Sequence, residues 1–322
     1  MIETLAPIAT GVNVEDVLRD ELASGDSALV SYGPILRHLL ASDEQSVFSD
    51  EIIARVRGMT SDLARQLLDE LSTAAGNADV REHDRDEVEA LIASFVVHPA
   101  LLTHCHALAL EWQLTERVHA RLALDPVLSP LLQALIASPD NATATASMAL
   151  LASQARFIQA QRRMKLPLVE LPGDLLHVML VALRAHAAGD ADTEAKSREA
   201  EAAIRARYDE GRSRIGIIAR LVTAMGGGAT AALSVTHAGV AIFTSALALV
   251  SGQDRDLAIL ATTDGQLARL ALSLRAAGLK PSAVEEQFVS LHPDVAMPGD
   301  FDQLGADRAA ALLARSTILP GA

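Results

Sequence analysis

Residues 50–76 read DEIIARVRGMTSDLARQLLDELSTAAG and carry a clear helical pattern. Their apolar side chains recur three and four positions apart, the spacing that places them on one face of an α-helix. Asp50 and Ser61 are residue types that cap helix N-termini, and Gly76 is the type that commonly follows a helix end. The pattern therefore predicts two helices here, the first capped by Asp50 and the second by Ser61.

The same period extends over most of the chain and predicts an all-α fold. Hydrophobic residues make up 50% of the 322 residues, whereas aromatic residues make up only 3%. Ala, Leu, Glu and Arg favour helices, and they outweigh the aromatic and β-branched residues that favour strands. We expect a helix from Asn13 to Gly25, a second one beginning near Ser27 or Pro34, and a long one over residues 141–164.

Spacing and composition predict a multi-helix array followed by a bundle. Residues 99–108 align with residues 126–135 at four of ten positions, which favours a HEAT-like array over residues 1–185. Residues 190–214 mix seven acidic with six basic residues, as a solvated connecting helix does. The expected parts are an N-terminal helical array (1–189), a charged connecting helix (190–214), a C-terminal helical bundle (215–291) and a partly disordered tail (292–322) with a short helix at 306–315.

The charge distribution bears on partners and location. The formal net charge is −14, and residues 1–98 hold 19 acidic and 7 basic residues, a balance of −12. This acidic third disfavours nucleic acid and anionic membranes, and it serves solubility or attracts a basic partner. Cys105 is the single cysteine, so no intramolecular disulfide forms, and the first residues lack a secretory pattern. We expect a soluble, cytoplasmic protein that binds no nucleic acid.

An uncharged run covers residues 221–253, which contain no Asp, Glu, Lys or Arg. Its length would suffice to span a bilayer. The three glycines at 226–228 interrupt it early, however, and Ser, Thr and His237 dilute it. We therefore expect two buried helices of a soluble core, around 229–239 and 239–252, rather than a membrane span.

The residues whose side chains would best suit a metal site or a catalytic site are His104, Cys105 and His106. On a helix, side chains two positions apart point about 200° apart, so the two imidazoles do not share a metal ion. His104 and His106 are thus weak metal candidates, and neither is directed to activate Cys105 as a nucleophile. His177 lies in an apolar stretch and is expected to be a core histidine. We expect no catalytic residue, no metal site and no cofactor.

A basic face is predicted near the end of the helix over 141–164. Arg156, Gln159 and Arg163 are spaced i, i+3 and i+7, and Arg162 and Lys165 flank them. These cations complement the dipole at a helix C-terminus. They could equally dock the acidic N-terminal third of the same chain or an external acidic or phosphate-bearing partner. We take the five residues as candidates for partner binding.

Three motifs together resemble a known bacterial family. They are Asp125-Pro126-Val127-Leu128-Ser129-Pro130-Leu131-Leu132, Ala149-Leu150-Leu151-Ala152-Ser153-Gln154-Ala155-Arg156-Phe157 and Leu166-Pro167-Leu168-Val169-Glu170-Leu171-Pro172. With Leu272–Leu291 they are similar to the all-helical domain of unknown function 2336, over roughly residues 95–291. The resemblance implies a helical domain and carries no activity, substrate or catalytic residue with it.

The sequence thus favours a non-enzymatic helical scaffold or regulatory module that binds another protein. The alternative is a helical protein or enzyme that binds a small ligand or metal in a pocket between bundles. That alternative would use His104, Cys105, His106 or His177.

Overall fold

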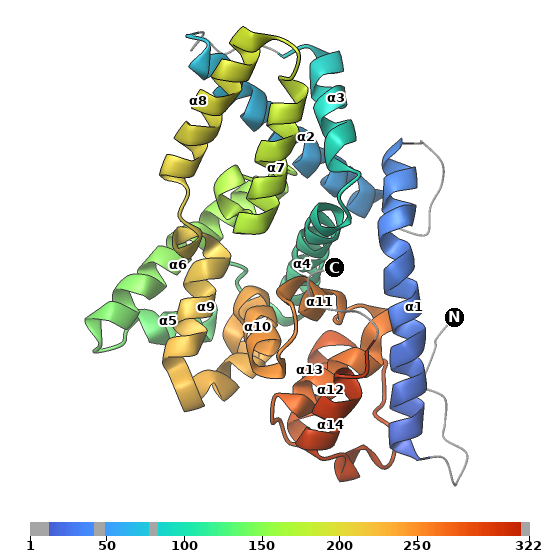
Figure 1. Cartoon of the computed structure of the whole chain (residues 1–322). Coiled ribbons are helices and arrows are strands. Elements are labelled where there is room, and N and C mark those ends of the chain that lie inside the picture. The colour runs from blue at the N-terminus through green and yellow to red at the C-terminus, as the bar shows by residue number, and fades with distance from the viewer. Residues whose placement is uncertain (1–12, 42–48, 77–82, 317–322) are drawn as a thin grey trace. The chain divides into compact units, whose positions relative to one another are not determined.

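The computed structural model describes residues 13–41, 49–76 and 83–316, and these contain helices and no strand. The prediction of an all-α fold is therefore confirmed. The chain divides into two compact units, each built from separated segments (Figure 1). Unit 1 takes residues 1–32, 110–152 and 217–322, and unit 2 takes residues 33–109 and 153–216.

The helices follow one another along the described chain as follows. They are α1 (Val14–Ala41), α2 (Asp50–Ala74), α3 (Arg85–Phe95), α4 (Pro99–Leu122), α5 (Pro130–Ile136), α6 (Asn141–Arg162), η1 (Leu168–Glu170), α7 (Gly173–His186), α8 (Ala191–Arg207), η2 (Glu210–Arg212), α9 (Arg214–Met225), η3 (Gly226–Leu233), α10 (Val235–Ser251), α11 (Arg255–Leu260), η4 (Asp264–Gln266), α12 (Leu267–Ala276), α13 (Pro281–Leu291), η5 (Phe301–Gln303) and α14 (Ala306–Leu313).

Two pairs of predicted helices are single long helices, so those predicted breaks are wrong. Helix α1 continues through Gly25 and Pro34, and α2 continues through Ser61, with Ser49 rather than Asp50 as its N-cap. A Cβ atom on Gly25 would lie 2.8 Å from Gln266 Nε2, and one on Gly58 would lie 2.6 Å from Met164 Cβ. These glycines let another segment approach the helix closely, and they do not end it.

Unit 2 is built on α2. Helix α2 packs against α3 and α8, and α7 packs against the same two helices. Residues 190–214 were expected to form a solvated connecting helix. In the structure α8 instead packs against α2 and α7 within unit 2. Arg207 of α8 pairs with Glu70 of α2 at 2.6 Å, and Arg184 of α7 pairs with Glu201 of α8 at 3.3 Å.

Unit 1 is centred on α10 and α12. Residues 238–248 of α10 are buried throughout, and α12 packs against α10, α13 and α14. The predicted tail contributes to this core, since Phe301, Leu304 and Leu312 are buried. The expected short helix at 306–315 is α14, and α12 holds it in place.

The uncharged run divides into a covered part and an exposed part. Gly239 has a φ of 75° and kinks the start of α10, which is buried as expected. The segment before it is not the expected buried helix over 229–239, because it is divided between η3 and the start of α10 and leaves Thr230, Ala231 and Thr236 exposed. By length and composition, Arg214–Leu233 could cross a membrane, and only 28% of its apolar window is buried.

A substitution at Gly58 tests the close approach of α2 to Met164. The added methyl of Gly58→Ala would meet the Met164 backbone oxygen at 2.8 Å, so we expect a loss of about 1–3 kcal/mol in unfolding free energy. The control is Gly33→Ala in α1, where the nearest atom is 4.0 Å away. There we expect a gain of up to about 1 kcal/mol from helix propensity. Urea unfolding measures both, and a Gly58→Ala protein as stable as the wild type would contradict the packing.

Candidate interaction surfaces

The predicted basic face exists as an exposed surface of unit 2. Arg156, Gln159, Arg162, Arg163 and Lys165 are all exposed, whereas Phe157 and Ile158 of the same helix are buried. The structure therefore places the five candidate residues at one helix end, as their spacing indicated. Whether they bind a partner stays a prediction.

Side chains of α2 hold the C-terminal end of α6 by hydrogen bonds. The exposed cations of the basic face are therefore not needed to hold this end in place. Arg55 is buried in α2, and its Nη1 donates to the Gln161 carbonyl oxygen at 2.8 Å. Asp62 and Gln66 accept from the backbone N–H groups of Leu166 and Leu168 at 3.2 and 3.0 Å. A buried guanidinium, which also pairs with Glu51 at 2.9 Å, thus hydrogen-bonds a carbonyl group at the end of the helix.

One of the five residues does pair with the acidic N-terminal third. Lys165 Nζ lies 3.4 Å from Asp62 Oδ1. Within the described residues, Arg156, Arg162 and Arg163 form no ion pair, so their charges are available to a partner. Docking onto the N-terminal third therefore accounts for Lys165 alone among the five residues.

A buried arginine in unit 2 was not singled out from the sequence. The Arg214 guanidinium carbon lies 3.6 Å from the centre of the Phe157 ring, a cation–π contact. Its Nη1 donates to Gln154 Oε1 at 3.3 Å, and its backbone N–H donates to Glu170 Oε2 at 2.8 Å. Arg214 therefore fixes the inner side of α6 and acts as a structural residue.

The histidines lie where the helical pattern puts them, with one exception. His104, Cys105 and His106 are buried in α4, and burial lowers the pKa of His106 to about 4. Within residues 13–41, 49–76 and 83–316, no three His, Cys, Asp or Glu side chains gather as metal ligands would. His177 was expected in the core, but it is exposed on α7, with its Nδ1 3.1 Å from Arg205 Nη2.

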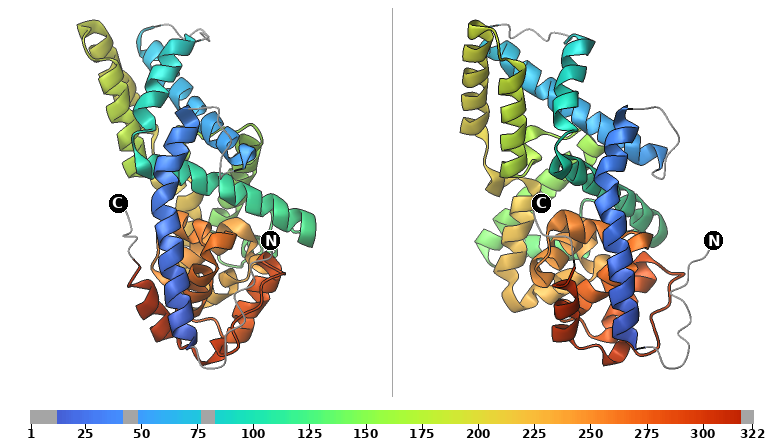
Figure 2. Two further views of the ribbon diagram at one scale, coloured as in Figure 1. Left: turned by 90° about the vertical axis from the view of Figure 1, so that its right-hand side faces the viewer. Right: turned by 45° about the vertical axis from the view of Figure 1, so that its right-hand side comes forward.

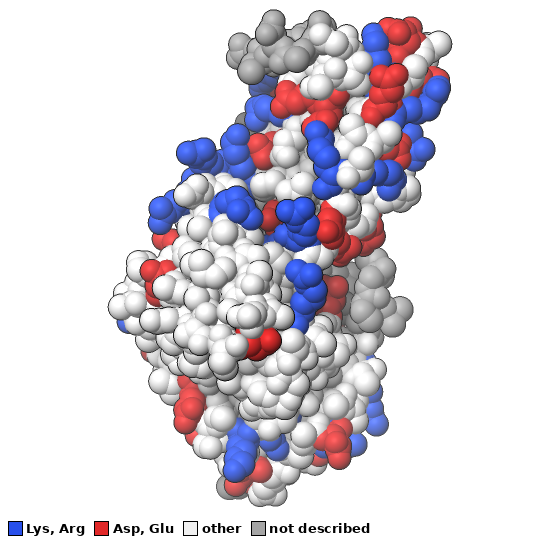
Figure 3. Space-filling model, turned by 90° about the vertical axis from the view of Figure 1, so that its left-hand side faces the viewer, with Lys and Arg blue, Asp and Glu red and all other residues white. Residues whose placement is uncertain are grey.

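A second surface lies on unit 1 and is almost free of charge. We call the exposed side chains of residues 128–152 and 223–231 the uncharged face; Asp140 is its one charged residue. Most of them belong to α5, the first half of α6, the last turn of α9 and η3, which lie side by side in Figures 1 and 2. Figure 3 shows the broad surface that results, with Lys, Arg, Asp and Glu gathered elsewhere.

The chemistry of the uncharged face is that of small and apolar groups. Met148 is 52% exposed and Leu128 is 38% exposed, and alanine, glycine and threonine make up most of the rest. The uncharged run that begins at residue 221 was evident in the sequence, but it was predicted to be buried in the core. Hydropathy does not distinguish a covered helix from an exposed one when the residues are small.

Comparison of the chain with protein-family models, curated proteins and solved structures yields no match.

The buried His106 predicts a specific pH dependence of stability. Its pKa is about 4 in the folded protein and 6.5 in the reference state, so the unfolded chain binds more protons between these values. The contribution of His106 to the unfolding free energy is therefore fully present above pH 6.5 and is lost as the pH falls toward 4. From pH 7.5 to pH 5 the loss from this group is about 2 kcal/mol.

Replacement of the imidazole isolates this effect. His106→Asn should lose less stability than the wild type between pH 7.5 and 5, in urea unfolding at both values. Val289→Asn is the control, because Val289 is 68% exposed and the substitution changes no titratable group, so the wild-type pH dependence should be kept. Equal pH dependence in wild type and His106→Asn would contradict the assignment.

Proposed function

We propose that this chain is a non-enzymatic scaffold or regulatory module that binds another protein through the uncharged face of unit 1. The observation that carries the proposal is the extent of this face on a chain with a net charge of −14 (Figure 3). The core of a protein–protein interface is depleted of charged residues. A large exposed area of that composition is characteristic of a surface that another protein covers.

The shape of the side chains supports a protein partner. Small residues such as Ala142, Ala149 and Ala224 let a partner backbone approach closely. Met148 is an adaptable apolar side chain of the kind used at binding surfaces. The face offers no cations for phosphate contacts, which supply most of the affinity for nucleic acid.

The basic face of unit 2 is proposed as a second contact with an acidic partner or segment. Arg156, Gln159, Arg162, Arg163 and Lys165 would form it, and bidentate arginine bonds to carboxylates suit that role. A HEAT-like array over residues 1–185, a cytoplasmic location and the likeness to domain of unknown function 2336 remain parts of this proposal.

Site-specific photo-crosslinking in the native cell tests the uncharged face. A photoreactive residue is placed at Met148 or at Thr223, two exposed positions of the face. The matched control position is Val289, which is 68% exposed on α13 and lies outside the face. We expect positions 148 and 223 to form an adduct with the same protein and position 289 to form none.

A charge introduced into the uncharged face provides a second test of the proposal. Met148→Glu should abolish the adduct formed from position 223, because the carboxylate would be buried without a partner. Unfolding free energy should change by no more than about 0.5 kcal/mol, since the site is exposed. Three results would refute the proposal: no adduct at 148 and 223, an equal adduct at 289, or adducts with further copies of this chain alone.

A further inference from the structure

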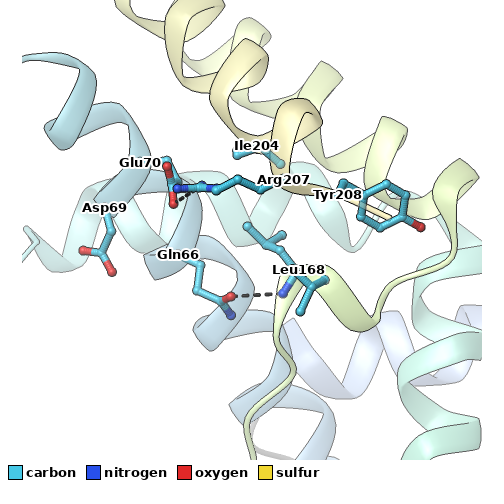
Figure 4. A pocket seen from close by; sticks show the side chains of 8 residues that line it. Gln66, Asp69, Glu70, Leu168, Ile204, Arg207 and Tyr208 are labelled. Atoms are coloured by element: carbon cyan, nitrogen blue, oxygen red, sulfur yellow. Dashed lines mark hydrogen bonds and ion pairs between the residues drawn. The ribbon is translucent and has the colours of Figure 1, made fainter. Parts of the chain in front are cut away.

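A pocket of about 310 Å³ opens on unit 2, apart from both surfaces described above. Three segments line it: α2 with Gln66, Asp69 and Glu70, η1 with Leu168 and Val169, and the end of α8 with Ile204, Arg207 and Tyr208. Figure 4 shows Leu168 facing Ile204 across the pocket, Glu70 and Arg207 meeting on one side, and Tyr208 on the other. Its volume is at the lower end of the range for small-ligand sites.

The floor of the pocket is apolar. Leu168 and Ile204 are buried, and Val169 beside them is 51% exposed. The ring of Tyr208 continues this surface, because its hydroxyl is turned to the Leu171 carbonyl oxygen, to which it donates at 2.7 Å. A ligand therefore meets aliphatic side chains and an aromatic ring.

Most polar groups of the lining are already used. Gln66 Oε1 accepts from the Leu168 N–H at 3.0 Å, and Gln66 Nε2 donates to the Leu166 carbonyl oxygen at 2.9 Å. Arg207 is neutralised by Glu70 at 2.6 Å. Asp69 contacts His83 Nε2 through Oδ1 at 2.6 Å, and a carboxylate accepts at both of its oxygens.

The remaining charge of the pocket is negative. Its lining holds two carboxylates, Asp69 and Glu70, and one guanidinium, Arg207, which leaves one negative charge. Burial, and then the carboxylates of Glu210, Asp174 and Asp209, raises the pKa of Tyr208 to about 12. The Tyr208 hydroxyl therefore keeps its proton and adds no charge to the pocket, and a cation beside Asp69 would be attracted to its carboxylate.

We propose that this pocket binds an aliphatic ammonium group, with its alkyl stem on Leu168, Val169 and Ile204 and its cation toward Asp69. The ligand class is a primary alkylamine, either as a free polyamine or as a lysine side chain of another protein. The site is independent of the uncharged face, so either proposal can fail without the other.

Methyl NMR of the full chain tests the pocket directly, because its floor carries the methyl groups of Leu168, Val169 and Ile204. The probes share one chain length: pentylamine, neutral pentanol and anionic pentanoate. We expect pentylamine to shift these three methyl signals saturably, with a dissociation constant about 2–5-fold lower than that of pentanol. Pentanoate should bind more weakly than either.

Substitutions in the pocket separate the contribution of the Asp69 charge from that of the contacts with the alkyl stem of the ligand. Asp69→Asn should weaken pentylamine about 2–5-fold and leave pentanol unchanged. Val169→Ala should weaken both. Glu199→Gln, an exposed carboxylate of α8 outside the pocket, is the control and should change neither.

Two further probes distinguish the sources of the amine. Tighter binding of spermidine than of Nα-acetyl-lysine methylamide assigns the pocket to a free polyamine, and the reverse order assigns it to a protein lysine. The proposal is overturned if the three methyl signals do not shift, if pentanol binds as tightly as pentylamine, or if Asp69→Asn leaves the amine preference intact.

Discussion

A buried ion pair between Asp26 of α1 and Arg269 of α12 closes unit 1, and the rest of that unit depends on it. Ser316 joins it by donating to Asp26 Oδ2 at 2.9 Å, and Gln253 Oε1 accepts from Arg269 Nη1 at 3.2 Å. Burial lowers the pKa of Arg269, and Asp26 opposes that shift. Buried charges are tolerated only when they are paired and hydrogen-bonded. Residues near the beginning of the described chain and three segments of its last quarter must therefore meet at this point for unit 1 to form.

The elements that could be predicted from sequence are those that local signals determine. The helical period over residues 141–164 predicted a long helix, and α6 spans Asn141–Arg162. The predictions that failed concern residues whose role lies in a distant contact. Gly25 looked like a helix end, yet it lets Gln266 reach the α1 backbone, where Gln266 Nε2 donates to the Gly25 carbonyl oxygen at 2.7 Å. Gly58 has the same role toward Met164 in α2. No local pattern distinguishes a glycine that ends a helix from one that admits a neighbour.

The same distinction holds for the candidate sites. The exposure of Arg156, Gln159 and Arg163 follows from helical period alone, so the sequence located the basic face. The pocket on unit 2 could not be found this way, because three separate segments form it. The uncharged face was visible as a run without charge, but its exposure depends on which side of η3 the core covers. Composition therefore indicated which residues are uncharged, and only the packing shows which of them are exposed.

A double-mutant cycle at Asp26 and Arg269 tests the central claim most directly, with unfolding free energy as the measured quantity. Asp26→Asn and Arg269→Met should each cost about 3–5 kcal/mol, because each leaves a buried charge without its partner. The double variant should cost less than the sum of the two by about 0.5–3 kcal/mol. Costs that add to within about 0.5 kcal/mol would show that the two residues act independently. That result would contradict the account of unit 1 as a core closed by this pair.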